Sequence, residues 1–219
     1  MSEGIHPVAS LLAAVARGIT GVQVQWAGCE PDERQRIYFA NHTSHLDFVV
    51  LWSALPSEIR AYTRPIAAKD YWEETSLRHY LAEKVFKAVL LERGAMSKAR
   101  SHEDAKFVGR SLIEDMAAAL GERNSLILFP EGTRGTGEKV GEFRGGLYHL
   151  AVRRPDVELV PAYMENMNRI LPKGEYLPVP MLSLLTFGKP IQVQAGEDKD
   201  AFLERAREAV SSLRRIGFA

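Results

Sequence analysis

The chain has one cysteine, no surplus of either charge and no long apolar run, and each absence excludes a class of protein. Cys29 is the single cysteine among 219 residues, so no internal disulfide can form. The 28 Lys and Arg residues balance 28 Asp and Glu residues, without the basic surplus of a nucleic-acid-binding protein. Residues 8–16 form an apolar run shorter than the roughly 18 residues that cross a membrane. The start carries Glu3 where a signal peptide carries Lys or Arg, so we expect a cytoplasmic protein that contacts membranes only at their surface and binds no nucleic acid.

The sequence does have the composition of an ordinary folded domain. Hydrophobic residues make up 46% of the chain and charged residues 26%, and a chain of this length buries a core without disulfides. We expect an N-terminal amphipathic helix in residues 1–20 and one domain in residues 21–219. Helical spacing unites the apolar residues of the first segment, which are Val8, Leu11, Leu12, Val15 and Ile19. Two interpretations of this stripe stay open: it packs against the domain, or it lies on a lipid surface.

Patterns of apolar residues along the rest of the chain predict strands that alternate with helices. Strands are expected at residues 22–26, 36–40, 59–62, 88–91, 125–129, 159–163, 182–187 and 191–193. Helices are expected at residues 44–55, 72–86, 101–120, 145–152 and 198–213. This alternation predicts a single α/β domain with a central, mostly parallel mixed β-sheet flanked by helices. In such sheets, sites lie where the carboxyl ends of strands lead into helices.

One such turn combines a histidine with an aspartate. His42 follows the strand that ends at residue 40, and Asp47 comes five residues later, in the first turn of the next helix. A carboxylate there can hold one imidazole nitrogen as a donor, which leaves the other nitrogen free to take a proton from a hydroxyl. Two other interpretations stay open. Asp47 closes a capping box with Ser44, or His42, His45 and Asp47 bind a metal, although their spacing fits no standard zinc pattern and we predict no metal site.

A second turn follows the strand that ends at residue 129, with the sequence Pro130-Glu131-Gly132-Thr133-Arg134. Glycine lets backbone amides approach an anion closely, and the planar guanidinium of Arg134 matches the geometry of a phosphate. The plain alternative is a glycine-rich turn with a solvated arginine. The two turns are more informative together than apart, because each follows an apolar strand and each carries the charge that the other lacks.

These residues resemble the glycerolipid acyltransferases, specifically the 1-acylglycerol-3-phosphate acyltransferases. The resemblance rests on His42-x4-Asp47 and on the highly specific hexapeptide Phe-Pro-Glu-Gly-Thr-Arg at residues 129–134. Two shorter blocks agree with it: residues 89–93, an apolar strand that ends in Glu-Arg, and residues 160–162, a strand with a central proline. Phe-Arg-Gly-Gly at residues 143–146 matches the family's pattern on the C-terminal side of the hexapeptide. The resemblance covers about residues 22–193 and implies the glycerol-3-phosphate acyltransferase-like fold.

The resemblance implies transfer of a fatty acyl group to the sn-2 hydroxyl of 1-acylglycerol 3-phosphate, giving phosphatidic acid. The donor would be an acyl thioester, either acyl-CoA or an acyl carrier protein, and no other cofactor is implied. His42 would be the general base and Asp47 would orient it. The implied ligands of the acceptor's phosphate are Lys69, Arg93, Glu131, Gly132, Thr133 and Arg134. The partners would be a lysophospholipid, the thioester donor and, through peripheral contact, the inner face of the membrane.

The chain departs from the family's pattern at two places. His45 stands where an aromatic residue is common, and the N-terminal stripe is shorter than the hydrophobic anchor of many members. Within the family, the acceptor could instead be glycerol 3-phosphate, another lysophospholipid or a lyso-ornithine lipid. Outside it, the alternatives are a metal-dependent hydrolase that uses His42, His45 and Asp47, or a lipid-binding protein without catalysis.

Overall fold

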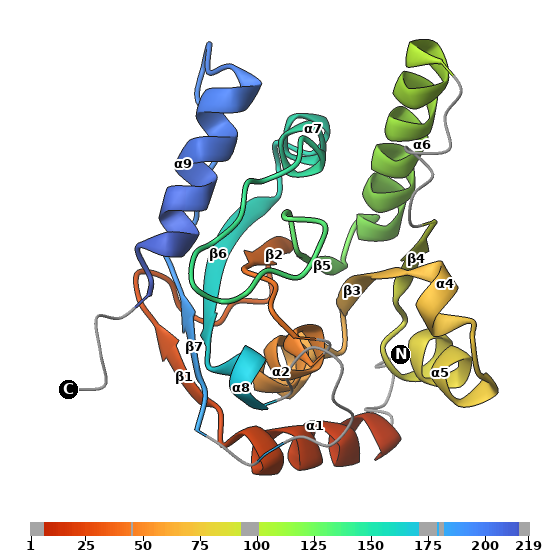
Figure 1. Ribbon diagram of the computed structural model, residues 1–219, viewed down its shortest axis with the longest axis vertical. Coiled ribbons are helices and arrows are strands. Elements are labelled where there is room, and N and C mark those ends of the chain that lie inside the picture. The colour runs from red at the N-terminus through yellow and green to blue at the C-terminus, as the bar shows by residue number, and fades with distance from the viewer. Residues whose placement is uncertain (1–6, 45, 93–100, 171–178, 180–181, 215–219) are drawn as a thin grey trace.

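A seven-stranded β-sheet forms the centre of the computed structural model, which describes residues 7–44, 46–92, 101–170, 179 and 182–214 (Figure 1). The strands are β1 (Gln23–Trp26), β2 (Arg36–Ala40), β3 (Thr63–Ala68), β4 (Val89–Leu91), β5 (Ser125–Leu128), β6 (Glu158–Glu165) and β7 (Leu184–Phe187). Their order in the sheet is β1-β7-β6-β2-β5-β3-β4. Every pairing is parallel except β6 with β7, so β2 to β6 run in one direction and β7 and β1 in the other. The predicted α/β fold with a mostly parallel mixed sheet is confirmed.

Helices cover both faces of this sheet (Figure 1). The core on one face includes side chains from α1 (Pro7–Thr20), α2 (Asp47–Ala54), α3 (Ser57–Arg60), the π-helical turn η1 (Leu81–Val85) and α8 (Met167–Ile170). The core on the other face includes side chains from α6 (His102–Leu120), α7 (Gly146–Arg153) and α9 (Lys199–Ser211). Two short helices, α4 (Lys69–Trp72) and α5 (Ser76–Tyr80), lie near the β4 edge of the sheet. The sheet therefore separates two hydrophobic cores.

Strand β2 lies between β6 and β5 and is buried along its whole length. Successive side chains of a strand point to opposite faces. Ile37 and Phe39 accordingly belong to the core under α6, α7 and α9, whereas Tyr38 and Ala40 belong to the core under α1 and α2. A strand buried on both faces is expected to be continuously apolar, which explains why residues 37–40 are predicted so clearly from the sequence.

The predicted strand at residues 59–62 is wrong. The chain forms helix α3 there, and the strand of this region is β3, which begins at Thr63. A proline within β3 obscures the strand in the sequence, since proline cannot donate to a ladder. Residues 63–65 pair with β5 and residues 66–68 with β4, so Pro65 lies before the pairing with β4 begins. The strand predicted at residues 191–193 is reduced to a single bridge between Ile191 and Leu159.

The predicted N-terminal helix forms as α1 and packs against α2, with Ala9 and Ala13 buried. Val8 and Leu12 contact the same core, but Leu11 is 64% and Val15 47% exposed. The stripe therefore divides: one part packs against the domain, and the other faces outward. Within the part of the chain that the structure describes, no helix has the length and apolar character needed to cross a membrane.

Candidate active site

The carboxyl ends of β2 and β5 bring the two motif-bearing turns together. These strands are parallel neighbours, and their ladder ends with Phe39 opposite Leu128. The turn that contains His42 and the turn that contains Glu131 therefore leave the same edge of the sheet side by side. Lys69 begins α4 at the end of β3 on the same edge, two strands away from β2. Arg93 follows β4 but lies outside the described residues.

His42 and Asp47 form a hydrogen-bonded pair. The Nδ1 atom of His42 lies 2.9 Å from Oδ2 of Asp47, whose carboxylate is fully buried at the start of α2. A carboxylate accepts, so this contact fixes the imidazole tautomer with hydrogen on Nδ1. No described residue forms a hydrogen bond with Nε2, and the His42 side chain is 24% exposed. The pair has the geometry of an oriented base with a free nitrogen at the surface of the site.

The same oxygen of Asp47 also organises the backbone of its turn. Oδ2 accepts hydrogen bonds from the amides of Thr43, at 2.6 Å, and Ser44, at 2.9 Å. The contact with Ser44 is one half of the capping box considered from the sequence, so capping and orientation of the imidazole occur together. Ser44 is not the N-cap residue, because α2 begins at Asp47 with Leu46 as its N-cap; the Ser44 hydroxyl instead accepts the amide of Leu46 at 3.3 Å.

Glu131 joins the two turns. Its Oε1 accepts the amide of His42 at 2.7 Å, and its Oε2 accepts the amide of Gly141 at 2.9 Å. In the other direction, the carbonyl of His42 accepts the amide of Gly135 at 2.8 Å. Burial raises the pKa of the Glu131 carboxyl, and the two amides oppose this shift by stabilising its charged form. The imidazole of His42 also stacks on the ring of Phe129, with 4.5 Å between centroids.

The described residues that are predicted to bind phosphate lie on two turns, the one after β5 and the one after β3. Gly132 and Thr133 are exposed, and Arg134 is half-buried with no ion pair to any described residue. Lys69 is half-exposed, and its Nζ lies 3.9 Å from a carboxylate oxygen of Glu73. The described contacts thus bring His42, Asp47 and Glu131 together and leave Lys69 and Arg134 unconnected to them. Their role at a phosphate stays a prediction.

Three residues beyond the predicted phosphate ligands contribute to this turn. Gly135 and Gly141 donate the amides described above, and Arg144 donates from Nε to the carbonyl of Glu131 at 3.2 Å. Gly132 has a φ of +69°, and a Cβ there would lie 2.7 Å from Nε of Arg144. The glycines at residues 132, 135 and 141 are the feature of the sequence that could have indicated this tight turn, because a loop that folds closely around a side chain leaves no room for Cβ atoms.

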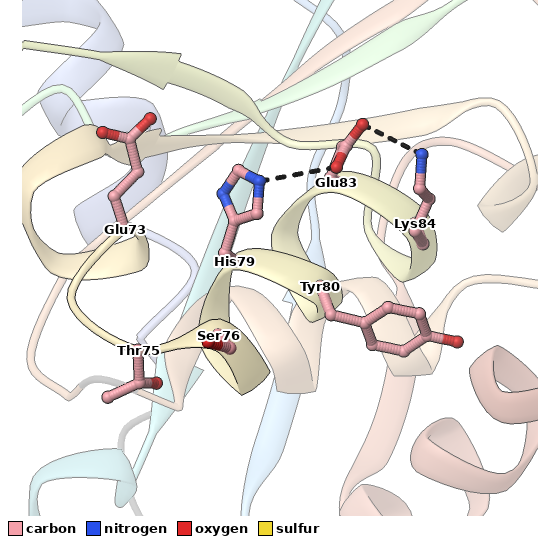
Figure 2. Close-up of a pocket in the computed structure, with 7 residues that line it drawn as sticks. All are labelled: Glu73, Thr75, Ser76, His79, Tyr80, Glu83 and Lys84. Carbon is pink, nitrogen blue, oxygen red and sulfur yellow. Dashed lines mark hydrogen bonds and ion pairs between the residues drawn. The ribbon is translucent and has the colours of Figure 1, made fainter.

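A pocket of about 360 Å³ lies elsewhere, around α5 (Figure 2). Its lining residues are Glu73, Thr75, Ser76, His79, Tyr80, Glu83 and Lys84. Within it, Glu83 contacts both His79, at 3.5 Å, and Lys84, at 2.9 Å. None of the predicted site residues lines this pocket. Among the described residues, no group of three His, Cys, Asp or Glu side chains could hold a metal ion, and His45 lies outside them.

Both turns lie within a segment that matches the sequence model of a known family. The sequence model of the family described as Acyltransferase matches residues 22–165, which include both turns and strands β1 to β6. The chain belongs to the acyltransferase family. The family resemblance drawn from residues 41–47 and 129–134 is therefore confirmed.

Two curated relatives carry the name 1-acyl-sn-glycerol-3-phosphate acyltransferase. The protein from Limnanthes douglasii is 26% identical over 171 residues, and the protein from Limnanthes alba is 25% identical over 169 residues. Each alignment covers 74% of this chain but only 53% and 52% of the relatives, so the chain spans about half of their length.

A solved structure shares the fold. The crystal structure of the 1-acyl-sn-glycerophosphate (LPA) acyltransferase PlsC from Thermotoga maritima matches with a TM-score of 0.69 at 20% sequence identity. The match covers 94% of this chain and 76% of that chain. The acyltransferase fold predicted from the sequence is thus confirmed over nearly the whole chain.

Proposed function

We propose that this protein transfers a fatty acyl group from an acyl thioester to the sn-2 hydroxyl of 1-acylglycerol 3-phosphate and so forms phosphatidic acid. The donor is acyl-CoA or an acyl carrier protein. The observation that carries the proposal is the His42–Asp47 pair, in which Asp47 holds Nδ1 and no described residue occupies Nε2. The names of the relatives from Limnanthes support the choice of acceptor.

The chemistry follows from the free nitrogen of the imidazole. The hydroxyl of the acceptor attacks the thioester carbonyl carbon while Nε2 of His42 takes its proton. Asp47 stabilises the imidazolium that results, because its carboxylate lies 2.9 Å from Nδ1. The tetrahedral intermediate then collapses with cleavage of the C–S bond, and the imidazolium returns the proton to the departing thiolate. The products are the new ester and a free thiol, and no covalent acyl-enzyme forms.

Cationic residues on the same edge of the sheet are proposed to bind the acceptor's phosphate. Neighbouring strands are about 4.8 Å apart, so the turn of Lys69 begins about 10 Å from the turn of His42. Arg134 lies on the intervening turn after β5. Arg93 comes two residues after β4 in the sequence and lies outside the described residues. A phosphate held on the β5–β3–β4 side leaves the hydroxyl of the glycerol to reach His42. We include Gly132 and Thr133 as neighbours of that phosphate.

The acceptor and product carry acyl chains, so we place the reaction at the surface of a membrane, on its cytoplasmic face. Helix α1 presents Leu11 and Val15 outward, and Leu182 is 58% exposed. Leu182 lies at the end of α1, since a Cβ on Gly21 would be 2.7 Å from its Cδ2 atom. This exposed apolar surface is the proposed site of peripheral contact with lipid.

The decisive experiment measures thiol release from acyl-CoA and acyl carrier protein with a panel of acceptors. The panel contains lysophosphatidic acid, glycerol 3-phosphate, lysophosphatidylcholine and a lyso-ornithine lipid, presented in mixed micelles. We expect release with lysophosphatidic acid and a fall in turnover of roughly 10²- to 10⁴-fold in His42→Ala. His149→Ala is the matched control, because His149 is exposed on α7.

Each other result changes a different part of the proposal. Release with another acceptor keeps the mechanism and replaces the substrate. Full activity in His42→Ala would show that His42 is not the general base. Hydrolysis that depends on an added metal would favour the metal-dependent hydrolase, and lipid binding without release would favour a binding protein.

A further inference from the structure

The contacts of Glu131 do not suit a ligand of phosphate. The side chain is only 6% exposed, and both carboxylate oxygens accept backbone amides, from His42 and from Gly141. An ionised carboxylate repels a phosphate, and a protonated one would bind it only by pointing a hydrogen toward it. Here both oxygens face N–H donors, which favour the ionised form. The carboxylate is therefore directed into the protein.

Glu131 extends the hydrogen bonding between β2 and β5 beyond the end of their ladder. Backbone pairing stops at Phe39 and Leu128. Three residues further along, the amide of His42 bonds to the Glu131 side chain, and the carbonyl of His42 bonds to the amide of Gly135. Both backbone polar groups of His42 are thus held by the turn after β5. Without Glu131, the half-buried amide of His42 would lose this acceptor.

The turn after β5 is built around this carboxylate. The amide of Gly141 donates to Oε2, and a Cβ on Gly141 would lie 2.6 Å from that oxygen, closer than real Cβ atoms approach. A Cβ on Gly135 would lie 3.3 Å from it. The loop from residue 131 to residue 141 therefore returns to its own first side chain, and glycine is needed at residue 141 for this contact.

We propose that Glu131 is a positioning residue for His42 and does not bind the acceptor's phosphate. Its carboxylate holds the backbone of His42 so that the imidazole stays hydrogen-bonded to Asp47 and stacked on Phe129, with Nε2 left free for the substrate. The expected effect of this positioning on acyl transfer rests on the proposed function. It requires that loss of Glu131 affects turnover and leaves the affinity for the acceptor unchanged.

The kinetic test compares Glu131→Gln with Glu138→Gln, an exposed carboxylate on the same loop. Glutamine offers one oxygen and one NH₂ group to two amide donors, so at least one charge-assisted bond is lost and the other becomes neutral. We expect kcat to fall about 10- to 100-fold and KM for lysophosphatidic acid to stay within about twofold. Glu138→Gln changes neither. A raised KM with unchanged kcat in Glu131→Gln would identify a phosphate ligand and overturn the inference.

Gly141→Ala provides a second variant that keeps the charge of Glu131. Its new methyl group displaces the carboxylate from the amide of residue 141, and we again expect a lower kcat with an unchanged KM. Unchanged kcat in a folded Gly141→Ala protein would contradict the inference. The melting temperature of each variant, followed by circular dichroism, establishes that the kinetics belong to folded protein.

A measurement without substrate separates this inference from the proposed function. NMR hydrogen exchange reports the protection of the amides of His42 and Gly141 in the wild-type protein, Glu131→Gln and Glu138→Gln. We expect protection of at least one of these amides to fall about 10-fold or more in Glu131→Gln only. Equal protection of both amides in all three proteins would show that Glu131 does not hold the turn. This result stands even if the wild-type protein transfers no acyl group to any acceptor.

Discussion

The two ends of β2 both carry buried charged residues, but at the amino end these form ion pairs, whereas at the carboxyl end a buried carboxylate oxygen has no described hydrogen-bond partner. Arg36, at the amino end, is 1% exposed. Its Nε donates to Glu158 at 2.9 Å, and its Nη1 donates to the carbonyl of Glu30 at 2.8 Å. The other oxygen of Glu158 accepts from Arg34. Every charge in this cluster faces an opposite charge or a backbone group within the described structure.

The carboxyl end of the same strand is different. Nε2 of His42 has no hydrogen-bond partner among the described residues, and neither does the buried Oδ1 of Asp47 or the buried hydroxyl of Thr43. Arg134 on the adjacent turn has no described ion pair. Buried polar groups without partners are uncommon, since each costs free energy of folding. Among the described residues, two of the four buried side-chain atoms without a hydrogen-bond partner, Oδ1 of Asp47 and Oγ1 of Thr43, lie at the end of the sheet that carries the acyltransferase motifs; the other two are the hydroxyls of Tyr38 and Thr186.

The difference separates charges that stabilise the fold from charges that face a substrate. Removing one partner of a buried ion pair leaves the other uncompensated, so the amino end governs stability. At the carboxyl end, a residue is held in place through one atom while another atom stays free. Asp47 holds Nδ1 of His42, and Nε2 of the same ring has no described partner. Substitutions at the amino end should therefore lower the free energy of unfolding, and substitutions at the carboxyl end should lower kcat or raise KM.

The largest effect is expected at Asp47. Asp47→Ala removes the acceptor of His42 and of two backbone amides, and we expect kcat to fall about 10³-fold. In Asp47→Asn the amide oxygen can take the place of Oδ2, so the tautomer of His42 is kept and only the charge is lost. We expect that variant to lose about 10²-fold. Thiol-release kinetics below the melting temperature measure both.

Equal losses in the two Asp47 variants would contradict the idea that the charge and the hydrogen bond contribute separately. Wild-type kcat in both would remove Asp47 from the mechanism and, with it, the functional distinction between the two ends of β2.

The next effect is expected at the amino end. Arg36→Met keeps the volume of the side chain but leaves Glu158 with Arg34 as its only described cationic partner. We expect the free energy of unfolding to fall by about 3 kcal/mol, while kcat of the folded protein stays within about twofold. Urea unfolding and thiol-release kinetics measure the two quantities. Arg153→Met is the control, because the ion pair of Arg153 with Glu114 is exposed and should contribute little. A large fall in kcat at unchanged stability in Arg36→Met would contradict the assignment of stability to the amino end and of activity to the carboxyl end.

The sequence predicts the fold well where burial dominates. Residues 36–40 form the predicted strand, and the helix predicted at residues 101–120 forms as α6, with Ser101 as its N-cap and Gly121 after its end. Prediction fails where tertiary pairing overrides the local signal. Pro65 argues against a strand at β3, because the sequence does not show that the strand changes its pairing from β5 to β4 after that residue.

At the site, the sequence predicts the two turns and the pair of His42 and Asp47, because the order of strands and turns places them at one edge. It does not predict what the Glu131 side chain contacts. A glutamate after a strand looks the same in the sequence whether it faces solvent, a ligand or the backbone of the neighbouring turn. Only the path of the loop back to Gly141 decides this, and that path depends on the packing of residues 131–144.

The smallest expected effect concerns Arg134, and it distinguishes binding from catalysis within the carboxyl end. A guanidinium without a described ion pair is free to bind the acceptor's phosphate, so Arg134→Ala should raise KM for lysophosphatidic acid about tenfold with kcat within about twofold. Arg123→Ala is the matched control, because Arg123 is exposed near the amino end of the same strand, β5, and stacks on Tyr62. An unchanged KM in Arg134→Ala would leave Lys69 and Arg93 as the proposed cationic ligands. A fall in kcat without a change in KM would instead place Arg134 with Glu131 among the residues that position His42.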